Sequence, residues 1–575
     1  MALLQSVSFK SSAAPLNIHN AHHHKPMNPM IRPLANKKQT IITIPLPLIC
    51  CNNKNQSVTT LSDDYGVGAA TAKLKILKHV LREIGDSYEC LNLIDAAQRL
   101  GIDYHFQEEI ESVLHKQYIL FNAVQFDPHT DLPKASLLFR LFRQQGYPAS
   151  ADVFKIFLDH VGKFDEELRH DIKGLTSLYE ASQLCMHEED ILEEAESFSS
   201  HWLSAWAVHV DHHSAAFVHN TLAHPCHKSV AQFMVPNYFG DIQWTNKWIH
   251  ILQDVARLDF NTTQRLRQNE IAQFSKWWEE TDLAKELSFA RNQPIKWYMG
   301  SLICLTDPCF SEERVLLAKS ITFIYLIDDI FDVFGSRDEL TLFTQLVCRW
   351  DLVGGKKLPN SMQVVLKSLF EVTNEISYKI YQKHGWNPAS SLKKAWAKLC
   401  KAFLVEAEWL SCGHSPSAEE YLRNGIVSTG VHVVLVHVFF LLGERISKQT
   451  VELLEDDLDI ILSSATILRL WDDMGNAKDE NQEGRDGSYE KYYMKEHPSM
   501  CCNITRQHMM RKISEAWKTL NKESQLLSTT LPAKFIQASL NIARAVPLTY
   551  NYGRNQSLPT FEQLIEQLLF HSVEI

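Results

Sequence analysis

Apolar residues along most of the chain recur every three or four positions, which is the spacing of one face of an α-helix. The pattern begins near Ala69 and continues through segments such as 137–142 and 153–161, with Pro148 between them. No pair of β-branched runs flanks an Asn-Gly or Asp-Gly turn, so hairpins are not expected. No unit of roughly 20–50 residues repeats at a fixed period, which disfavours a solenoid. The pattern predicts an all-α protein.

Pro and Gly interrupt the helical pattern at Val235–Gly240, and we place a domain boundary there. Residues 63–240 form a predicted N-terminal helical domain, which carries no Asp-rich cluster. Residues 241–575 form a predicted C-terminal helical domain, which carries two clusters of acidic residues. A chain of 575 residues has room for two such domains, each with its own core.

The first 62 residues differ from the rest in composition. They contain six Lys or Arg, no Asp or Glu, and many Ser, Pro, Asn and His. This composition is typical of an organelle transit peptide, which is removed from the mature protein. Arg32 is the single arginine, so an Arg-rich mitochondrial leader is disfavoured and a plastid leader is expected. A chain that does not use this leader would remain in the cytosol.

Charge and hydropathy limit the partners of the protein. The net charge of -11, without a basic stripe, argues against nucleic acid. No apolar run reaches the ~20 residues that a membrane helix needs, and the longest, near 433–442, is interrupted by His437. The cysteines show no CxxC or zinc spacing and therefore predict reduced thiols. No apolar seam indicates an obligate dimer, so we expect a soluble monomer.

The most informative chemistry follows the apolar segment 321–327. Asp328, Asp329 and Asp332 come next, before Gly335, where a helix can end. Asp328 and Asp332 are four residues apart and therefore share one helix face. Carboxylates this close repel one another unless a cation neutralises them, and oxygen ligands suit Mg²⁺ or Mn²⁺, which can bridge them to substrate phosphates. The alternative is a solvated acidic helix end.

A second acidic row follows another apolar segment. Asp472, Asn476 and Glu480 are spaced by four residues, so they project from nearly the same face of one helix. Arg469 lies one turn earlier and can hold a phosphate oxygen with its fork of donors. A single row of this kind is usually a solvated helix face. Two such rows in one helical chain indicate a site in which both rows bind a metal–diphosphate cluster.

The two rows resemble the paired DDxxD and (N/D)Dxx(S/T)xxxE motifs of plant class I terpene synthases, and their order and separation match that family. Other segments similar to the family are Ile94–His105, Leu258–Asn261, Phe289–Gln293 and Asp479–Tyr489. The resemblance covers residue 64 to the end of the chain. It implies two helical domains, an N-terminal α-barrel-like domain without chemistry of its own and a C-terminal catalytic helical bundle.

The resemblance also implies roles for individual residues. Two Mg²⁺ ions would be bound by the catalytic carboxylates of Asp328, Asp329 and Asp332, and a third by Asp472, Asn476 and Glu480, with Mn²⁺ as a substitute. The diphosphate would be bound by Arg291 and Arg469, and through metal by Asp328 and Asp332. The cavity would be lined by aromatic residues, with Trp297, Phe331 and Tyr550 as the candidates, although aromatic residues at helical spacing are more often core. Gly430 marks either a helix break beside the cavity or a packing site.

The sequence departs from the family pattern at points that bear on the product. Asn476 replaces the usual Ser or Thr, and Gln293 stands where many relatives have a second arginine. The chain has no Arg-Arg pair and its first tryptophan is Trp202, so the Arg-Arg…Trp motif of cyclising monoterpene synthases is absent. The sequence therefore resembles the subgroup that makes acyclic terpene alcohols.

These features predict an enzyme that ionises geranyl diphosphate and lets water capture the allylic cation. Capture at the internal carbon gives linalool, or nerolidol from farnesyl diphosphate, whereas capture at the terminal carbon gives geraniol. A cyclising mono- or sesquiterpene synthase and a chain-elongating prenyltransferase are alternatives within enzymes. Outside enzymes, the alternative is a catalytically dead helical scaffold. Intact carboxylates at Asp328, Asp329 and Asp472 disfavour the scaffold, because it has no need to tolerate their mutual repulsion.

Overall fold

The computed structural model describes residues 64–84, 87–123, 131–235, 248–476, 487–549 and 561–574. Within these ranges the chain is helical and contains no strand, and its extended pairing is limited to one isolated antiparallel bridge between Leu158 and Phe164. The predicted all-α fold is confirmed.

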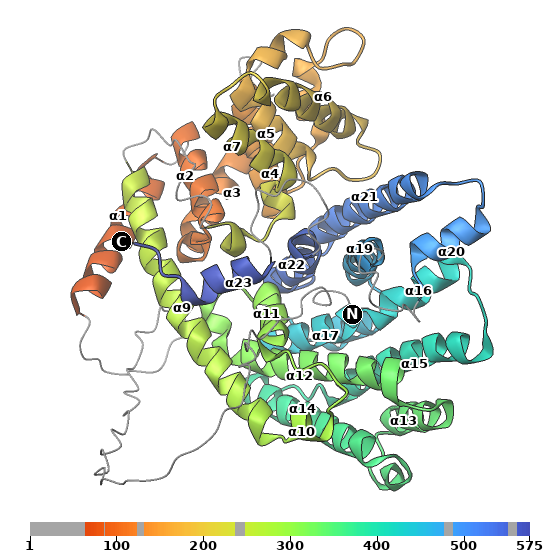
Figure 1. The fold of residues 1–575 in the computed structure, drawn as a ribbon. Helices are drawn as coiled ribbons and strands as arrows, with labels where there is room; N and C mark the ends of the chain where they lie inside the picture. Colours follow the sequence, from red (N-terminus) through yellow and green to blue (C-terminus); the bar gives the residue numbers. More distant parts are fainter. Residues whose placement is uncertain are drawn as a thin grey trace, which may run out of the picture.

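The N-terminal helices form one group, drawn from orange to olive in Figure 1. Their apolar faces enclose a single core that runs from Leu77 to Ala256. The helices are α1 (Asp64–Ile84), α2 (Tyr88–Arg99), α3 (Gln107–Ala123), α4 (Leu132–Gln144), α5 (Ile172–Ser182), α6 (Asp190–Ala207) and α7 (His212–Ala223). The 3₁₀ turns are η1 (Asp103–Phe106), η2 (Ala151–Phe157), η3 (Glu166–His170) and η4 (Cys226–Lys228).

The C-terminal helices surround a second and larger core, drawn from green to blue in Figure 1. They are α9 (Ile249–Glu280), α10 (Leu283–Glu286), α11 (Pro294–Cys304), α12 (Ser311–Asp329), α13 (Arg337–Arg349), α14 (Asn360–His384), α15 (Ala389–Cys412), α16 (Ala418–Ser428), α17 (Val431–Leu442), α18 (Lys448–Glu455), α19 (Asp459–Asn476), α20 (Tyr489–Glu496), α21 (Cys502–Leu526), α22 (Ala533–Thr549) and α23 (Phe561–Phe570). Short turns are η5 (Pro308–Phe310), η6 (Ile330–Phe334) and η7 (Val353–Lys357).

Helix α9 belongs to both cores. Its first turns, with Leu252 and Val255, pack into the N-terminal core, and its later residues Phe260 and Phe274 pack into the C-terminal core. The long α9 ribbon accordingly runs along both groups of helices in Figure 1. The predicted boundary at residue 240 lies outside the described residues and stays a prediction.

Local sequence signals account for the ends of many helices. Asp131 precedes α4 and its side chain accepts a hydrogen bond from the Lys134 backbone N–H at 2.9 Å, with Pro133 in the first turn. Ser336 and Glu339 form a reciprocal capping box at the start of α13. These interactions satisfy backbone donors that the first turn of a helix leaves without partners.

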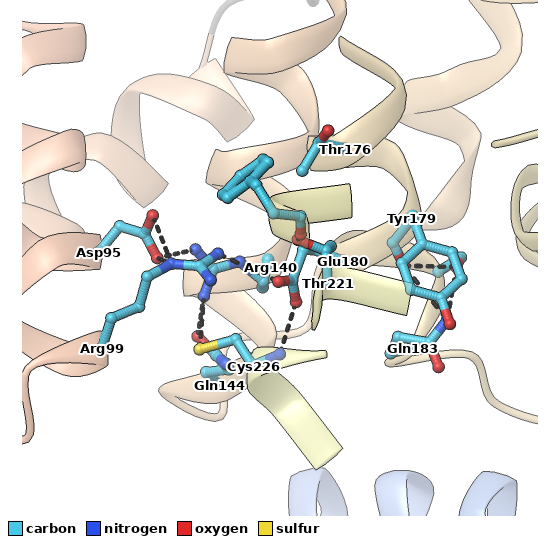
Figure 2. Close-up of polar contacts among 12 residues, drawn as sticks. Asp95, Arg99, Arg140, Gln144, Thr176, Tyr179, Glu180, Gln183, Thr221 and Cys226 are labelled. Carbon is cyan, nitrogen blue, oxygen red and sulfur yellow. Dashed lines mark hydrogen bonds and ion pairs between the residues drawn. The ribbon is translucent and has the colours of Figure 1, made fainter. Parts of the chain in front are cut away.

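The N-terminal core contains a buried polar network, shown in Figure 2. Asp95 accepts hydrogen bonds from Arg99, at 3.0 and 3.1 Å, and from Arg140. Glu180 accepts from Arg99 at 3.2 Å and from the Cys226 backbone N–H at 2.8 Å. Burial alone would raise the pKa of Asp95, but Arg140 and Arg99 hold it below its usual value. Two carboxylates balance two guanidinium groups, which is the composition of a structural ion network.

Turn η4 connects this network to the C-terminal half of the chain. His227 lies beside Cys226, and its Nε2 is 2.8 Å from Asn521 Oδ1 of α21. The His227 carbonyl accepts a hydrogen bond from Arg544 of α22 at 2.6 Å. Helices α21 and α22 both pack against α19, so the N-terminal domain supports the helix that carries the second acidic row.

One stretch among the described residues, Ala418–Leu442, has the length and apolar composition of a membrane-crossing helix. It comprises α16 and α17, and 78% of its most apolar window is buried inside the fold. Its burial accounts for its composition, because a helix that is apolar all round suits a protein core.

Candidate active site

One pocket, part of it open to solvent, lies between α12, α15, α16 and α19. It receives side chains from both acidic rows, although the rows are far apart in the sequence. The lining residues are Asp328, Asp332, Phe403, Glu406, Trp409, Leu410, His414, Tyr421, Ser428, Arg469, Asp472, Asp473, Gly487 and Tyr492. Carboxylates, a guanidinium and aromatic rings therefore converge on one space.

The first acidic row lies where α12 changes into the π-helical turn η6. The Gly335 N–H donates to the Ile330 carbonyl at 2.9 Å, and this wider turn ends the helix at the predicted glycine. Such π turns recur at functional sites. Asp328 and Asp332 both line the pocket, as expected for residues on one helix face. Asp328 and Asp329 are 5% and 6% exposed, so both carboxyl groups are largely withdrawn from water.

Arg291 lies against two carboxylates of the first row. Its Nη2 is 2.5 Å from Asp328 Oδ2, its Nε is 2.7 Å from Asp329 Oδ1, and its backbone N–H donates to Asp329 Oδ2 at 2.8 Å. Burial raises the pKa of Asp329 to about 6, although Arg291 acts in the opposite direction. Burial lowers the pKa of Arg291, but Asp328 and Asp329 hold it above its usual value. Arg291 is therefore held as a cation beside the first row.

The second acidic row lies at the end of α19. Asp472 is 3% exposed and lines the same pocket as Asp328 and Asp332. Arg469 Nη1 lies 3.9 Å from Asp472 Oδ2, and its Nε lies 3.6 Å from Asp473 Oδ1. Burial raises the pKa of Asp473 to about 7, against the effect of Arg469. Glu480 and the side chain of Asn476 lie outside the described residues.

Glu406 of α15 is a further acidic residue of the pocket, and the sequence motifs did not single it out. Its carboxylate lines the pocket and accepts hydrogen bonds from Ser428 Oγ at 2.7 Å and Asn424 Nδ2 at 3.1 Å. Arg469 Nη2 lies 3.6 Å from Glu406 Oε1. The signal for Glu406 was a carboxylate within the otherwise apolar segment 402–407.

Helices α16 and α17 are separated at Gly430, where a helix break was one of the two expectations. Gly430 has φ of 75°, in the left-handed region that glycine adopts without steric cost. A Cβ at this position would lie 2.6 Å from Cγ2 of Ile324 on α12. The break therefore lets α12 approach closely, and it lies just after Ser428, a residue that lines the pocket.

The three residues predicted to line the cavity differ in their surroundings. Trp297 is fully buried in the C-terminal core, edge-on to Trp278 at 4.9 Å between ring centroids. Phe331 is buried with its ring 5.7 Å from that of Phe403, which lines the pocket. Tyr550 lies outside the described residues. Phe403 and Trp409 were not singled out in the sequence, and both line the pocket.

The chemistry of the pocket fits hard divalent cations, which bind carboxylate oxygens. Within the described ranges, no group of three or more His, Cys, Asp or Glu side chains is gathered closely enough to hold a metal ion. Asp328 and Asp329 contact Arg291 there. The carboxylates of Asp332, Glu406 and Asp472 supply further oxygen atoms around the same pocket.

Two family models match the chain, and they match its two halves. Residues 50–222 match the "Terpene synthase, N-terminal domain", and residues 279–519 match the "Terpene synthase family, metal binding domain". An (E)-nerolidol synthase of Cannabis sativa is 50% identical over 86% of this chain and 90% of its own length. The chain belongs to the terpene synthase family. The resemblance found in the sequence is thereby confirmed, and the protein is an enzyme of that family.

Two further comparisons bear on the chemistry of this terpene synthase. A chloroplastic S-(+)-linalool synthase of Arabidopsis thaliana is 44% identical over 84% of this chain and 85% of its own length. The crystal structure of isoprene synthase from grey poplar, in complex with three Mg²⁺ ions and dimethylallyl-S-thiolodiphosphate, is 30% identical. It superimposes with a TM-score of 0.81 and covers 89% of this chain and 98% of its own. The fold predicted for the C-terminal domain is therefore confirmed.

Proposed function

We propose that this terpene synthase ionises geranyl diphosphate in the pocket between α12 and α19, and that water captures the cation to give linalool. With farnesyl diphosphate we expect nerolidol. The observation that supports ionisation most directly is that both acidic rows and Arg469 face one pocket. A prenyl diphosphate ionises readily when the charge on its leaving group is stabilised, because the allylic cation is delocalised.

Carboxylates on opposite walls of the pocket would hold Mg²⁺. The first proposed set of Mg²⁺ ligands is Asp328, Asp329 and Asp332. The second is Asp472, Asn476 and Glu480. Glu406 offers a further carboxylate in the same pocket. When bound, the metal ions would neutralise the negative charge that develops on the departing diphosphate. We propose three Mg²⁺ ions, the number in the isoprene synthase complex, with Mn²⁺ as a substitute.

Arg291 and Arg469 would donate hydrogen bonds to the diphosphate from the two walls. Each guanidinium lies against acidic residues of its own row, and this contact supports a role beside a phosphate that a metal ion would hold on that row. The carbon–oxygen bond then breaks, and the electron pair leaves with the diphosphate. Phe403 and Trp409 line the same pocket, and their aromatic rings can shield the cation. Water bonds to the internal cationic carbon and loses a proton, which yields the tertiary alcohol.

The acyclic product is supported by the sequence and by the relatives. The chain lacks an Arg-Arg pair, and Gln293 stands where many relatives have arginine. Two relatives at 50% and 44% identity are named for nerolidol and S-(+)-linalool. Geraniol, from capture at the terminal carbon, and cyclic terpenes are the alternative products. Membership of the enzyme family disfavours the inert scaffold.

We propose that the protein acts as a monomer in the plastid stroma. The acidic-poor composition of residues 1–62 supports a plastid leader, and the linalool synthase relative is named as chloroplastic. In the cytosol, farnesyl diphosphate would be the expected substrate and nerolidol the product.

Product analysis by chiral gas chromatography tests the proposal. Protein beginning at Ser62 is incubated separately with geranyl and farnesyl diphosphate, with and without Mg²⁺, beside the Asp328→Ala variant. We expect linalool and nerolidol from the wild type only when Mg²⁺ is present, and no turnover from the folded variant. Cyclic hydrocarbons would refute the acyclic product. Activity that persists in Asp328→Ala would refute the assignment of Asp328 as a metal ligand. A wild type that forms no product would refute the proposal that geranyl and farnesyl diphosphate are substrates.

A further inference from the structure

Asp473 follows Asp472 directly, but its carboxylate is used differently. Its Oδ2 accepts a hydrogen bond from the backbone N–H of Tyr489 at 2.8 Å, and its Oδ1 lies 3.1 Å from the Tyr421 hydroxyl oxygen. The residue is 2% exposed. Both carboxylate oxygens of Asp473 therefore have protein partners.

Tyr421 of α16 connects three parts of the pocket wall. Its ring lies 5.0 Å from the guanidinium carbon of Arg469, a distance at which the cation is attracted to the ring face. Its hydroxyl lies within hydrogen-bonding distance of Asp473 on α19 and of the Gly487 carbonyl, at 3.1 and 2.8 Å. Tyr421 thus contacts the arginine, the end of α19 and the chain at residues 487–489, where the described fold resumes.

The guanidinium of Arg469 is held by charge and ring contacts. Its three carboxylate neighbours lie 3.6 to 3.9 Å away, which is beyond the usual hydrogen-bond distance. Within the described part of the chain, its buried Nε has no hydrogen-bond partner. A buried donor without a partner is costly, and a ligand oxygen in the pocket would satisfy it. The orientation of Arg469 therefore depends on its neighbours, which include the Tyr421 ring, Asp473 and Glu406.

We propose that Tyr421 and Asp473 are positioning residues of the diphosphate site, and this inference rests on the function proposed above. They aim Arg469 into the pocket and fix residues 487–489 against α19. Both act through other groups and neither touches the reacting atoms. Removing the Tyr421 hydroxyl breaks the link between the Gly487 carbonyl and Asp473, whose Oδ1 lies 3.6 Å from Arg469 Nε.

The test uses Mg²⁺ with inorganic pyrophosphate as the probe and thermal shift as the readout, because pyrophosphate binding does not require turnover. The variants are Tyr421→Phe, which keeps the ring, and Asp473→Asn, which keeps an acceptor but removes the charge. Tyr489→Phe is the matched control. It deletes a tyrosine hydroxyl from the same segment, one that contacts Glu419 and His508, and it keeps the backbone N–H that Asp473 binds.

We expect the pyrophosphate concentration for half-maximal stabilisation to rise about five- to tenfold in Tyr421→Phe, the scale of one net hydrogen bond. Asp473→Asn should raise it at least as much, since the arginine also loses a charged neighbour. The KM for geranyl diphosphate should rise in parallel, while Tyr489→Phe should bind pyrophosphate as the wild type does. A lower melting temperature in both variants with unchanged pyrophosphate binding would overturn the proposal. An equal effect of Tyr489→Phe would overturn it as well.

The outcomes separate this inference from the proposed function. A wild type that makes no terpene but binds Mg²⁺ and pyrophosphate, with the expected ranking of variants, would refute the function and support the positioning role. A wild type that makes linalool, with variants that bind pyrophosphate normally, would leave the function standing and refute the positioning role. A wild type without any pyrophosphate-induced shift would refute the positioning role.

Discussion

Gly430→Ala probes the helix break that lets α12 approach the wall of the pocket. Two separate costs follow from the structure. The first is conformational, because an alanine at φ of 75° pays roughly 1–2 kcal/mol for the left-handed conformation. The second is steric, because the new Cβ would lie 2.6 Å from Cγ2 and 3.2 Å from Cδ1 of Ile324. Overpacking of this kind typically costs about 1–3 kcal/mol.

Gly385→Ala is the matched control for the conformational cost. Gly385 ends α14 at φ of 72°, and a Cβ there meets no atom within 4 Å. Both substitutions also restrict the unfolded chain, which returns about 0.4–1 kcal/mol to stability. We therefore expect a net loss of about 1 kcal/mol at Gly385 and about 2–4 kcal/mol at Gly430. The difference between the two variants measures the steric cost alone.

Thermal and urea denaturation of both variants, with the Gly430→Ala/Ile324→Ala double variant, would check these values. Ile324→Ala removes the atoms that the new Cβ meets, so its combination with Gly430→Ala should cost less than the two single effects added together. Because the protein has two domains, the comparison rests on differences between variants measured under identical conditions. Equal losses at Gly430 and Gly385 would show that α12 moves aside without cost. The close approach would then have no structural consequence.

Three further predictions concern other parts of the molecule. Arg140→Met leaves buried Asp95 with one guanidinium in place of two, and urea denaturation should show a loss of about 3–5 kcal/mol, the cost of breaking a buried ion pair. Burial lowers the pKa of His437 to about 4, below the ~6.5 of an unfolded chain. The unfolded state therefore binds the proton first, so stability should fall as the pH drops from 6.5 towards 4, by up to about 1.4 kcal/mol per pH unit. His437→Phe should flatten that dependence in a pH series of denaturation curves. Asn476→Ala should raise the Mg²⁺ concentration for half-maximal activity more than it lowers the melting temperature, and an unchanged Mg²⁺ titration would remove it from the ligand set.

Features with local causes could be predicted from the sequence. Asp328 and Asp332 share a face because four residues make about one helical turn, and both line the pocket. Arg469 lies near Asp472 for the same reason. The helical segment also ends at the predicted Gly335, although its φ of -79° is one that any residue adopts. Such predictions need only the geometry of one helix.

Features that depend on how helices pack could not be predicted in this way. Glu406 reaches the pocket because α15 lies beside α16, where it receives hydrogen bonds from Ser428 and Asn424. Trp297 and Phe331 are buried in the C-terminal core, and residue type alone does not tell whether a buried ring also faces a cavity. Asp472 and Asp473 are adjacent and chemically identical, and tertiary contacts alone give Asp473 its hydrogen bonds to residues 421 and 489.

The charge of the pocket predicts the order in which ligands stabilise the protein. The lining carboxyl groups of Asp328, Asp332, Glu406 and Asp472 already outnumber the lining guanidinium of Arg469. A diphosphate anion that enters alone meets repulsion in a partly desolvated space, where charges interact more strongly than in water. We therefore expect pyrophosphate alone to leave the melting temperature unchanged, Mg²⁺ alone to raise it slightly, and both together to raise it by more than the sum of the separate effects. Stabilisation by pyrophosphate in a chelator would refute this reasoning, because the anion would then bind through Arg291 and Arg469 without a metal ion.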